Sequence, residues 1–149
     1  MQKISKITLT IMALGLALAS TIAMAASPVG LWKTIDDKTG KPRSLIRIHE
    51  TSGVYSAVVE KGLREGDTGE AVCDKCTDER KNQKIIGMTI AKDLTEKNGV
   101  YQGGQILDPE NGKTYKCKMT LDETGNKLEV RGFVGISLLG RSQTWLREE

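Results

Sequence analysis

The stretch VRGFVGISLLGRSQTWLR, residues 130–147, decides the fold that the sequence predicts. It ends in a strand-like segment that carries Trp145, and a second tryptophan, Trp32, lies far upstream in Gly30-Leu31-Trp32. A sheet that closes on itself must pair its first strand with its last. We therefore expect residues 31–35 to pair with residues 142–147, which brings Trp32 and Trp145 to one seam.

Working outward from this stretch, alternating apolar and polar residues recur between turn signals. The clearest run is residues 113–121, in which Tyr115, Cys117, Met119 and Leu121 share one face. A half-buried antiparallel strand has this pattern because successive side chains point to opposite faces. Further strand patterns cover residues 31–35, 44–50, 54–60, 85–94, 100–107, 127–133 and 142–147. We predict an all-β fold, an eight-stranded up-and-down antiparallel barrel, with a two-sheet sandwich as the alternative.

Residues 1–25 predict a secretory signal peptide. Lys3 and Lys6 form a positive start, an uncharged apolar run follows, and Ala23-Met24-Ala25 fits a cleavage site. A retained membrane anchor is the alternative, because the apolar run is about long enough to span a bilayer. We expect cleavage, and hence a single domain over residues 26–149 that is periplasmic or secreted and has no membrane span.

The charge of the expected mature chain is nearly balanced. Without Lys3 and Lys6 the 22 basic residues become 20, against 19 acidic ones, so the net charge is +1. No basic block stands out, and aromatic residues make up only 4% of the sequence. Both observations argue against a dedicated nucleic-acid-binding protein.

One connection, residues 61–84, is too long for a simple turn and has no strand pattern. Loops of this length within a compact domain are often functional. It is either a lid over the barrel mouth or a mobile crossover pinned by a disulfide. It contains Cys73 and Cys76, and Cys117 is the third cysteine.

The cysteines admit several pairings and roles. Export favours a disulfide, either Cys73–Cys76 or a bond from Cys117 to one of them. A redox dithiol lacks the usual thioredoxin-like surroundings, and a zinc site lacks a complete ligand set. The odd cysteine permits a disulfide-linked homodimer through Cys117, although its inward parity argues against one.

Catalytic chemistry has little support in the sequence. His49, the only histidine, shares a predicted strand with Ile46 and Ile48 but falls on the opposite face, toward solvent. Asp36 and Asp37 lie in a D-D-K-T-G segment, where aspartates usually cap turn backbone. We predict no enzyme activity, no catalytic residues, no cofactor and no metal.

Five segments together resemble the DUF2147 family of exported bacterial proteins. They are GLWKTIDD (residues 30–37), CDKC (73–76), GQILDPENGKTY (104–115), VRGFVGIS (130–137) and LGRSQTW (139–145). The resemblance implies a lipocalin-like, calycin-type barrel with no established enzymatic activity. Lipocalins carry a G-x-W motif and a late arginine that packs over its tryptophan. Here Gly30-Leu31-Trp32 matches the motif and Arg141 or Arg147 supplies the arginine, but the C-terminal helix of full lipocalins is missing.

A ligand inside the barrel is the functional expectation. Glycines on or beside strands (Gly87, Gly103, Gly104 and Gly132) indicate either interior space or bends. Two polar residues, Arg131 and Gln143, are the expected head-group contacts, Arg131 for a carboxylate or phosphate. The apolar contacts expected from strand parity are Trp32, Ile46, Ile48, Tyr115, Met119, Val130 and Trp145.

The predicted partner is a small apolar or amphipathic molecule such as a fatty acid or another lipid-like compound. Two alternatives remain at this stage. One is an envelope interaction protein whose barrel is filled, because an eight-stranded barrel is narrow enough for side chains to fill it. The other is an exported thiol- or metal-handling protein that uses Cys73 and Cys76.

Overall fold

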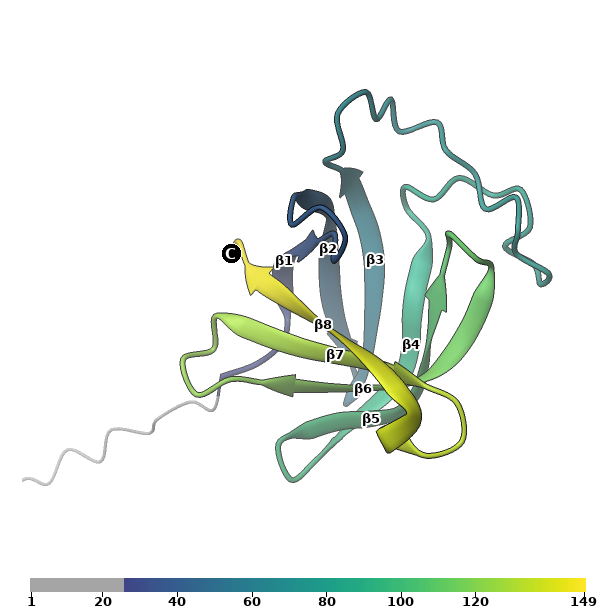
Figure 1. Cartoon of the computed structure of the whole chain (residues 1–149). Coiled ribbons are helices and arrows are strands. Elements are labelled where there is room, and N and C mark those ends of the chain that lie inside the picture. Colours follow the sequence, from purple (N-terminus) through teal and green to yellow (C-terminus); the bar gives the residue numbers. More distant parts are fainter. Residues whose placement is uncertain (1–25) are drawn as a thin grey trace, which may run out of the picture.

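The computed structural model describes residues 26–149, so the predicted signal peptide lies outside the described residues. Every strand pairs antiparallel with the next, and β1 pairs with β8 to close an eight-stranded up-and-down barrel (Figure 1). This confirms the predicted fold. The strands are β1 (Gly30–Ile35), β2 (Pro42–Thr51), β3 (Val54–Gly62), β4 (Thr89–Lys97), β5 (Val100–Asp108), β6 (Lys113–Leu121), β7 (Lys127–Phe133) and β8 (Gly140–Arg147), with a 3₁₀ turn, η1 (Ser137–Leu139), before β8.

The closing seam joins β1 to β8 as the sequence predicted. Trp32 pairs with Arg147 and Thr34 pairs with Trp145 in the antiparallel register. Both tryptophan side chains face inward, at 0% exposure for Trp32 and 2% for Trp145. Pairing of the two edge strands removes the exposed edges that an open sheet would present.

One half of the barrel is packed solid. This half lies toward the β2–β3, β4–β5 and β6–β7 turns, and its interior is filled by fully buried side chains. Tyr55 and Tyr101 add an edge-to-face aromatic pair there, with ring centroids 4.7 Å apart. The interior positions predicted from strand parity are confirmed by the buried Ile46, Ile48, Cys117, Met119, Leu128 and Val130.

The β4–β5 hairpin shows how turn chemistry sets the strand ends. Asn98 and Gly99 both have positive φ, +53° and +78°, as the tight turn between two antiparallel strands requires. Asparagine and glycine tolerate this conformation better than other residues. The Asn-Gly pair therefore joins β4 to β5, as predicted.

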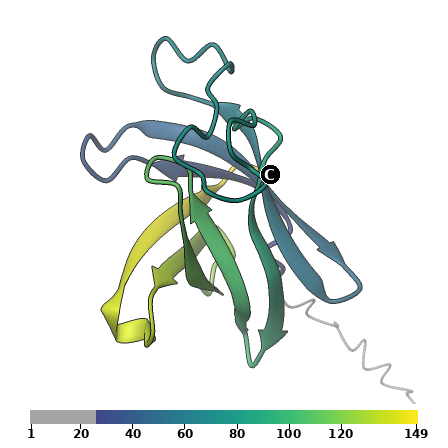
Figure 2. The same ribbon diagram turned by 90° about the vertical axis from the view of Figure 1, so that its right-hand side faces the viewer.

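Four connections gather at the other, open end of the barrel: residues 36–41, 63–88, 109–112 and 134–139. The longest of them, between β3 and β4, arches above the strands in both views (Figure 1, Figure 2). One predicted boundary is wrong here, because the strand expected from residue 85 begins at Thr89. Residues 85–88 instead complete the long connection, where Met88 donates its N–H to the Ile85 carbonyl at 3.0 Å.

The long connection is a folded cover held by its own contacts. A disulfide joins Cys73 to Cys76, which selects one of the pairings that the sequence left open. Backbone hydrogen bonds run from Cys73 N to Gln83 O and from Ile85 N to Ala71 O, each 2.9 Å long. The connection is thus pinned by a disulfide, as one interpretation predicted, and it lies over the barrel mouth, as the lid interpretation predicted.

Two contacts fasten this cover to the barrel. A Cβ on Gly112, in the β5–β6 turn, would lie 1.9 Å from the Lys75 carbonyl oxygen, so only glycine admits the cover here. The guanidinium of Arg80 reaches β4 and β6, donating to Thr89 O at 3.4 Å and to Thr114 Oγ1 at 3.2 Å. The cover is therefore attached to the barrel at Lys75, against the β5–β6 turn, and at Arg80, against β4 and β6.

Within residues 26–149, no helix has the length and hydropathy to cross a membrane.

Candidate ligand-binding site

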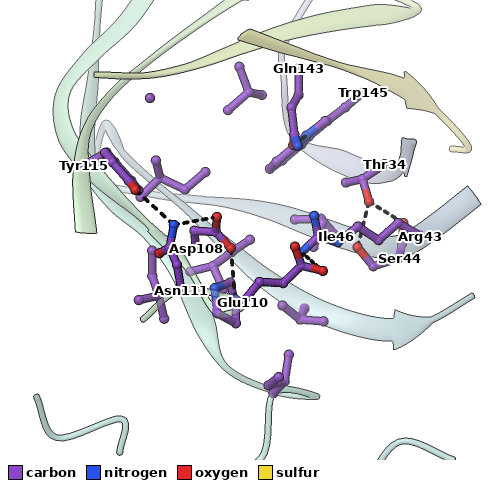
Figure 3. A pocket seen from close by; sticks show the side chains of 18 of the residues that line it. Thr34, Arg43, Ser44, Ile46, Asp108, Glu110, Asn111, Tyr115, Gln143 and Trp145 are labelled. Carbon is purple, nitrogen blue, oxygen red and sulfur yellow. Dashed lines mark hydrogen bonds and ion pairs between the residues drawn. The ribbon is translucent and has the colours of Figure 1, made fainter. Parts of the chain in front are cut away.

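A cavity of about 650 Å³ occupies the open half of the barrel. Its floor is the inner face of the strands and one wall is the cover, residues 63–88. Figure 3 shows side chains from β1, β2, β6 and β8 converging on this space. The barrel is thus packed at one end and hollow at the other, which contradicts the alternative of a filled barrel.

Most of the cavity wall is apolar. The strands contribute aliphatic and aromatic side chains from their inner faces, and the cover contributes two isoleucines from a segment that sequence analysis assigned to a strand. Apolar walls of this kind bury the apolar part of a ligand. The apolar lining residues are Ile46, Val59, Ala71, Val72, Ile85, Ile86, Ile90, Ile106, Leu107, Val130, Phe133, Val134, Leu139 and Trp145.

A few polar groups interrupt this wall. Thr34 Oγ1 and Ser44 Oγ lie 2.7 Å apart across β1 and β2, and Thr34 is buried. Asn111 Nδ2 donates to the Tyr115 hydroxyl at 3.0 Å (Figure 3). Gln143 projects from β8 beside Trp145, whose indole N–H donates to Gln143 Oε1 at 3.4 Å. These groups satisfy one another and leave the apolar surface dominant.

The rim of the cavity carries an ionic cluster that centres on Glu110. Arg64 lies 2.6 Å from its Oε1 and Arg43 lies 3.1 Å from the same atom. Arg64 also donates to Asp36 Oδ2 at 3.0 Å. The Arg64 hydrogen bond is the main reason that the pKa of Glu110 lies below its usual value. The cluster therefore places two guanidinium groups, which share the Glu110 carboxylate, at the entrance to an apolar space.

Asp36 belongs to the same cluster and confirms its predicted role in the turn. Its Oδ1 accepts N–H bonds from Lys38 at 2.9 Å and from Thr39 at 3.0 Å. The Thr39 amide, then Arg64, lowers the pKa of Asp36 to about 2. Asp37, beside it, pairs with Arg141. Both aspartates are thus occupied by turn and rim contacts.

Five of the predicted contact residues line the cavity, and three belong to the packed half. The five are Ile46, Tyr115, Val130, Gln143 and Trp145. The three are Trp32, Ile48 and Met119, which are fully buried below the cavity floor.

Arg131 corrects the prediction, because its side chain lies on the outside of the barrel. Val130 points inward, so the next residue on the strand points outward. Its guanidinium donates to the carbonyls of Ser137 at 2.6 Å and Leu138 at 3.3 Å, and to Ser142 Oγ at 2.9 Å. Arg131 therefore holds the β7–β8 connection, and Arg43 and Arg64 are the guanidinium groups at the cavity.

The three cysteines are buried, and the histidine lies outside the barrel, away from the cavity. Cys73 and Cys76 are 0% and 1% exposed, and His49 lies exposed on the outer face of β2. Cys117 is a buried free thiol, and burial raises its pKa to about 12. A disulfide-linked dimer through Cys117 would require this sulfur to leave the interior. Among residues 26–149, no group of three or more histidine, cysteine, aspartate or glutamate side chains is placed to hold a metal ion.

Comparison with known proteins identifies the family. A family model described as "Uncharacterized protein conserved in bacteria (DUF2147)" matches residues 30–147, the whole barrel from β1 to β8. The chain belongs to the DUF2147 family. A search of the curated proteins returned no match to it.

A solved structure similar to this DUF2147 barrel is protein HP1028 from the human pathogen Helicobacter pylori, described as belonging to the lipocalin family. The two share 20% sequence identity with a TM-score of 0.73, over 84% of this chain and 85% of that one. At this level of identity the likeness concerns the fold. The lipocalin arrangement of an arginine over the G-x-W tryptophan is present, and Arg147, not Arg141, supplies the arginine.

Several lining residues of this DUF2147 protein were not predicted. Thr34 and Ser44 follow from parity, since each lies two positions from an inward residue on its own strand. Ile85 and Ile86 were counted as strand residues, although they face the cavity from the cover. Arg43 lies on β2, whereas Arg64 and Glu110 lie in two different connections, and no local sequence signal brings the three together.

Proposed function

We propose that this protein binds a small amphipathic molecule, such as a fatty acid, in the open half of its barrel, and that it does so in the periplasm or after secretion. The cavity of about 650 Å³ carries the proposal. Sites for small molecules have volumes of roughly 300–1,000 Å³ and are mostly apolar with a few polar groups. The Cys73–Cys76 disulfide supports an oxidising location, because disulfides are rare in reducing compartments.

Arg43 and Arg64 are the proposed head-group contacts. A carboxylate at the rim would take the place of the Glu110 carboxylate, which lies 3.1 Å from Arg43 and 2.6 Å from Arg64. Arginine forks recognise carboxylates through paired, charge-assisted hydrogen bonds. The apolar tail would extend past Ile46 and Val130 toward Trp145, on the cavity floor.

Two measurements test whether the cavity holds such a ligand. Mass spectrometry of a denaturing extract, made from protein purified under gentle conditions, should show a co-purified acid or lipid. Displacement of a fluorescent fatty acid by palmitate should give a saturable curve with one site per chain. If both measurements fail, and melting temperature is unchanged across fatty acids of different lengths, the proposal is wrong.

Variants of opposite effect test the head-group assignment. Arg43→Gln combined with Arg64→Gln should weaken palmitate binding roughly 10- to 100-fold, while leaving hexadecanol nearly unaffected. Glu110→Gln should strengthen palmitate binding roughly 2- to 5-fold, because it removes the competing carboxylate. Arg47→Gln, which breaks a surface pair with Glu60 on the outside of β2, is the matched control. Equal losses for palmitate and hexadecanol would overturn the role of the two arginines.

A further inference from the structure

The β7–β8 connection presents the most exposed apolar side chains in the described part of the chain. We call residues 134–139 the apolar turn. Within it Val134 is 67% exposed, Ile136 61%, Leu138 83% and Leu139 75%. The other large apolar residues on the described surface are no more than 42% exposed. Soluble surfaces tolerate single exposed apolar residues, but a contiguous group of them marks an interaction site.

Polar contacts hold this turn against the barrel and leave Ile136 and Leu138 exposed to solvent. Arg131 donates to the carbonyls of Ser137 and Leu138, at 2.6 and 3.3 Å, and Lys118 Nζ lies 3.4 Å from Ser137 Oγ. Leu139 N donates to Ile136 O at 3.1 Å within the 3₁₀ turn. The backbone carbonyls of the turn are thus hydrogen-bonded to the barrel. Exposure of the apolar side chains to solvent contributes nothing to the stability of the fold.

Positive charge surrounds the base of the apolar turn. On the outer face of β6 and β7, Lys118 lies opposite Arg131 in the strand register, and Lys116 lies opposite Phe133, just before the turn. Glu129, which accepts a bond from Ser142 Oγ at 3.4 Å, is the acidic residue on this face of β7. We call Lys116, Lys118 and Arg131 the basic collar. The collar outnumbers the acid three to one.

The apolar turn also borders the opening of the cavity. Val134 and Leu139 line the cavity, whereas Ile136 and Leu138 do not line it and are exposed. Val72 and Ile86 of the cover line the same cavity. An apolar surface therefore continues from the inside of the cavity over its lip to the outside.

We infer that the apolar turn inserts into the surface of a bilayer that contains anionic phospholipid, with the basic collar against the head groups. A bilayer offers an apolar layer directly beneath a negatively charged one, and this order matches an apolar tip above a basic collar. A protein partner or a second copy of this chain would match the apolar tip, but a bilayer with anionic lipid also supplies the layer of negative charge that the basic collar faces. Docking here would place the cavity mouth at the membrane, so that an apolar ligand crosses without entering water. The inference goes beyond ligand binding, because the turn docks whether or not the cavity is occupied.

Vesicle co-sedimentation tests this inference. The purified protein, with its N-terminus established by mass spectrometry, is mixed with vesicles of phosphatidylcholine alone or with phosphatidylglycerol added. We expect binding to the mixed vesicles that falls with rising salt. Ile136→Ser combined with Leu138→Ser should lower the partition coefficient roughly 10- to 100-fold, because both residues contribute apolar surface. Lys116→Gln should weaken binding to the mixed vesicles and leave binding to phosphatidylcholine unchanged.

Matched controls separate docking from folding and from ligand binding. Val54→Ser removes an exposed apolar residue near the β2–β3 turn, at the packed end, and should bind vesicles as the parent protein does. Ile136 and Leu138 do not line the cavity, so their double variant should retain its melting temperature and its affinity for palmitate in solution. Absence of binding to the mixed vesicles, equal binding by the double variant, or self-association through the turn in sedimentation velocity would each overturn the inference.

Discussion

The guanidinium carbon of Arg147 lies 4.3 Å from the centre of the Trp32 ring, so the last strand of the barrel closes over the first. The same guanidinium donates to the carbonyls of Gly125 and Ser27, both at 2.6 Å, and to Val29 at 3.1 Å. It therefore ties together the segment before β1, the β6–β7 turn and β8. One side chain seals the packed end of the barrel, opposite the cavity.

Arg147→Ala should destabilise the barrel by about 2–4 kcal/mol, because it removes a cation–π contact and several charge-assisted hydrogen bonds at a buried tryptophan. Urea unfolding followed by tryptophan fluorescence measures this change. Arg141→Ala, which breaks an exposed pair with Asp37, should cost no more than about 1 kcal/mol. Equal losses for the two variants would show that Arg147 does not seal the barrel.

Opening the Cys73–Cys76 disulfide should loosen the cover and spare the barrel. The bond closes a ring of very few residues, so the chain-entropy model assigns it about 2 kcal/mol at most. Replacing both cysteines with alanine should speed proteolysis within residues 63–88 and weaken palmitate binding, while the strands keep their far-ultraviolet circular dichroism. Limited proteolysis read by mass spectrometry locates the cuts. First cuts in connections other than residues 63–88 would contradict the prediction that only the cover loosens.

Strand parity predicted most of the packed half, and it gave no assignment for β4 and β5, where the strands are irregular. The alternation from Tyr115 to Leu121 allows only one strand register, because a shift by one residue would turn every apolar side chain outward. Bulges break this rule. At the β4–β5 pair Asp93 and Gly103 both have positive φ, +61° and +85°, and the register beyond them cannot be counted from the sequence.

The cavity rim was not predictable for a different reason. Arg43, near the start of β2, meets Arg64 and Glu110 from two separate connections only in the folded barrel. Each residue alone reads as an ordinary surface charge. Arg131 shows the opposite error, since its chemistry suits a head-group contact but its position on β7 points it away from the cavity.

Thiol counting should reveal the state of all three cysteines. At pH 8 the native protein should show no reactive thiol, because Cys117 is buried and its pKa is raised to about 12. Denaturant should expose one thiol, and denaturant with reductant should expose three. Two or more reactive thiols in the native protein would contradict the disulfide.

The same burial predicts loss of stability at high pH. The pKa of Cys117 rises from 9.0 in the unfolded chain to about 12 in the fold. The stability that the buried, protonated Cys117 thiol contributes is therefore fully present below pH 9. It is lost as the pH rises toward 12, because the unfolded chain releases the proton first. Cys117→Ala should flatten this part of the stability profile, as measured by urea unfolding at each pH. An unchanged slope would show that other groups dominate.

Arg64→Gln should raise the pKa of Glu110 toward its usual value, because the Arg64 hydrogen bond is the main cause of its depression. Asp36 should rise from about 2 but stay below 3.8, since the Thr39 and Lys38 amides still bond to it. In the parent protein the Asp36 contacts stabilise the fold above pH 3.8, and this contribution is lost as the pH falls through about 2. Carboxyl carbon shifts followed by NMR measure both values.

Asp78 supplies the internal control for that titration. Its pKa is lowered to about 2 by Arg80, on the cover, and Arg64→Gln should leave it unchanged. Movement of Asp78 together with Glu110 would indicate a general loosening of the open end. A Glu110 pKa that does not move would contradict the pairing with Arg64.

Two strand glycines have different roles: Gly104 allows two strands to approach closely, and Gly132 lies at the edge of the cavity. A Cβ on Gly104 would lie 2.1 Å from the Lys92 carbonyl oxygen, so β4 and β5 approach each other too closely for any side chain. A Cβ on Gly132 would meet Ile106 and Tyr115 at 3.5 Å, which is ordinary contact at the edge of the cavity. Gly104→Ala should therefore cost about 1–3 kcal/mol of unfolding free energy, as overpacked sites do. Gly132→Ala should change it by no more than about 0.5 kcal/mol.

A larger side chain at Gly132 extends the comparison from stability to binding. Gly132→Leu places extra apolar volume against the cavity wall, and it should weaken palmitate more than a fatty acid of half the length, because the longer tail needs the whole space. Urea unfolding and fluorescent-ligand displacement on the same samples measure the two effects. Equal weakening of both acids would place the tail elsewhere than along Gly132, Ile106 and Tyr115.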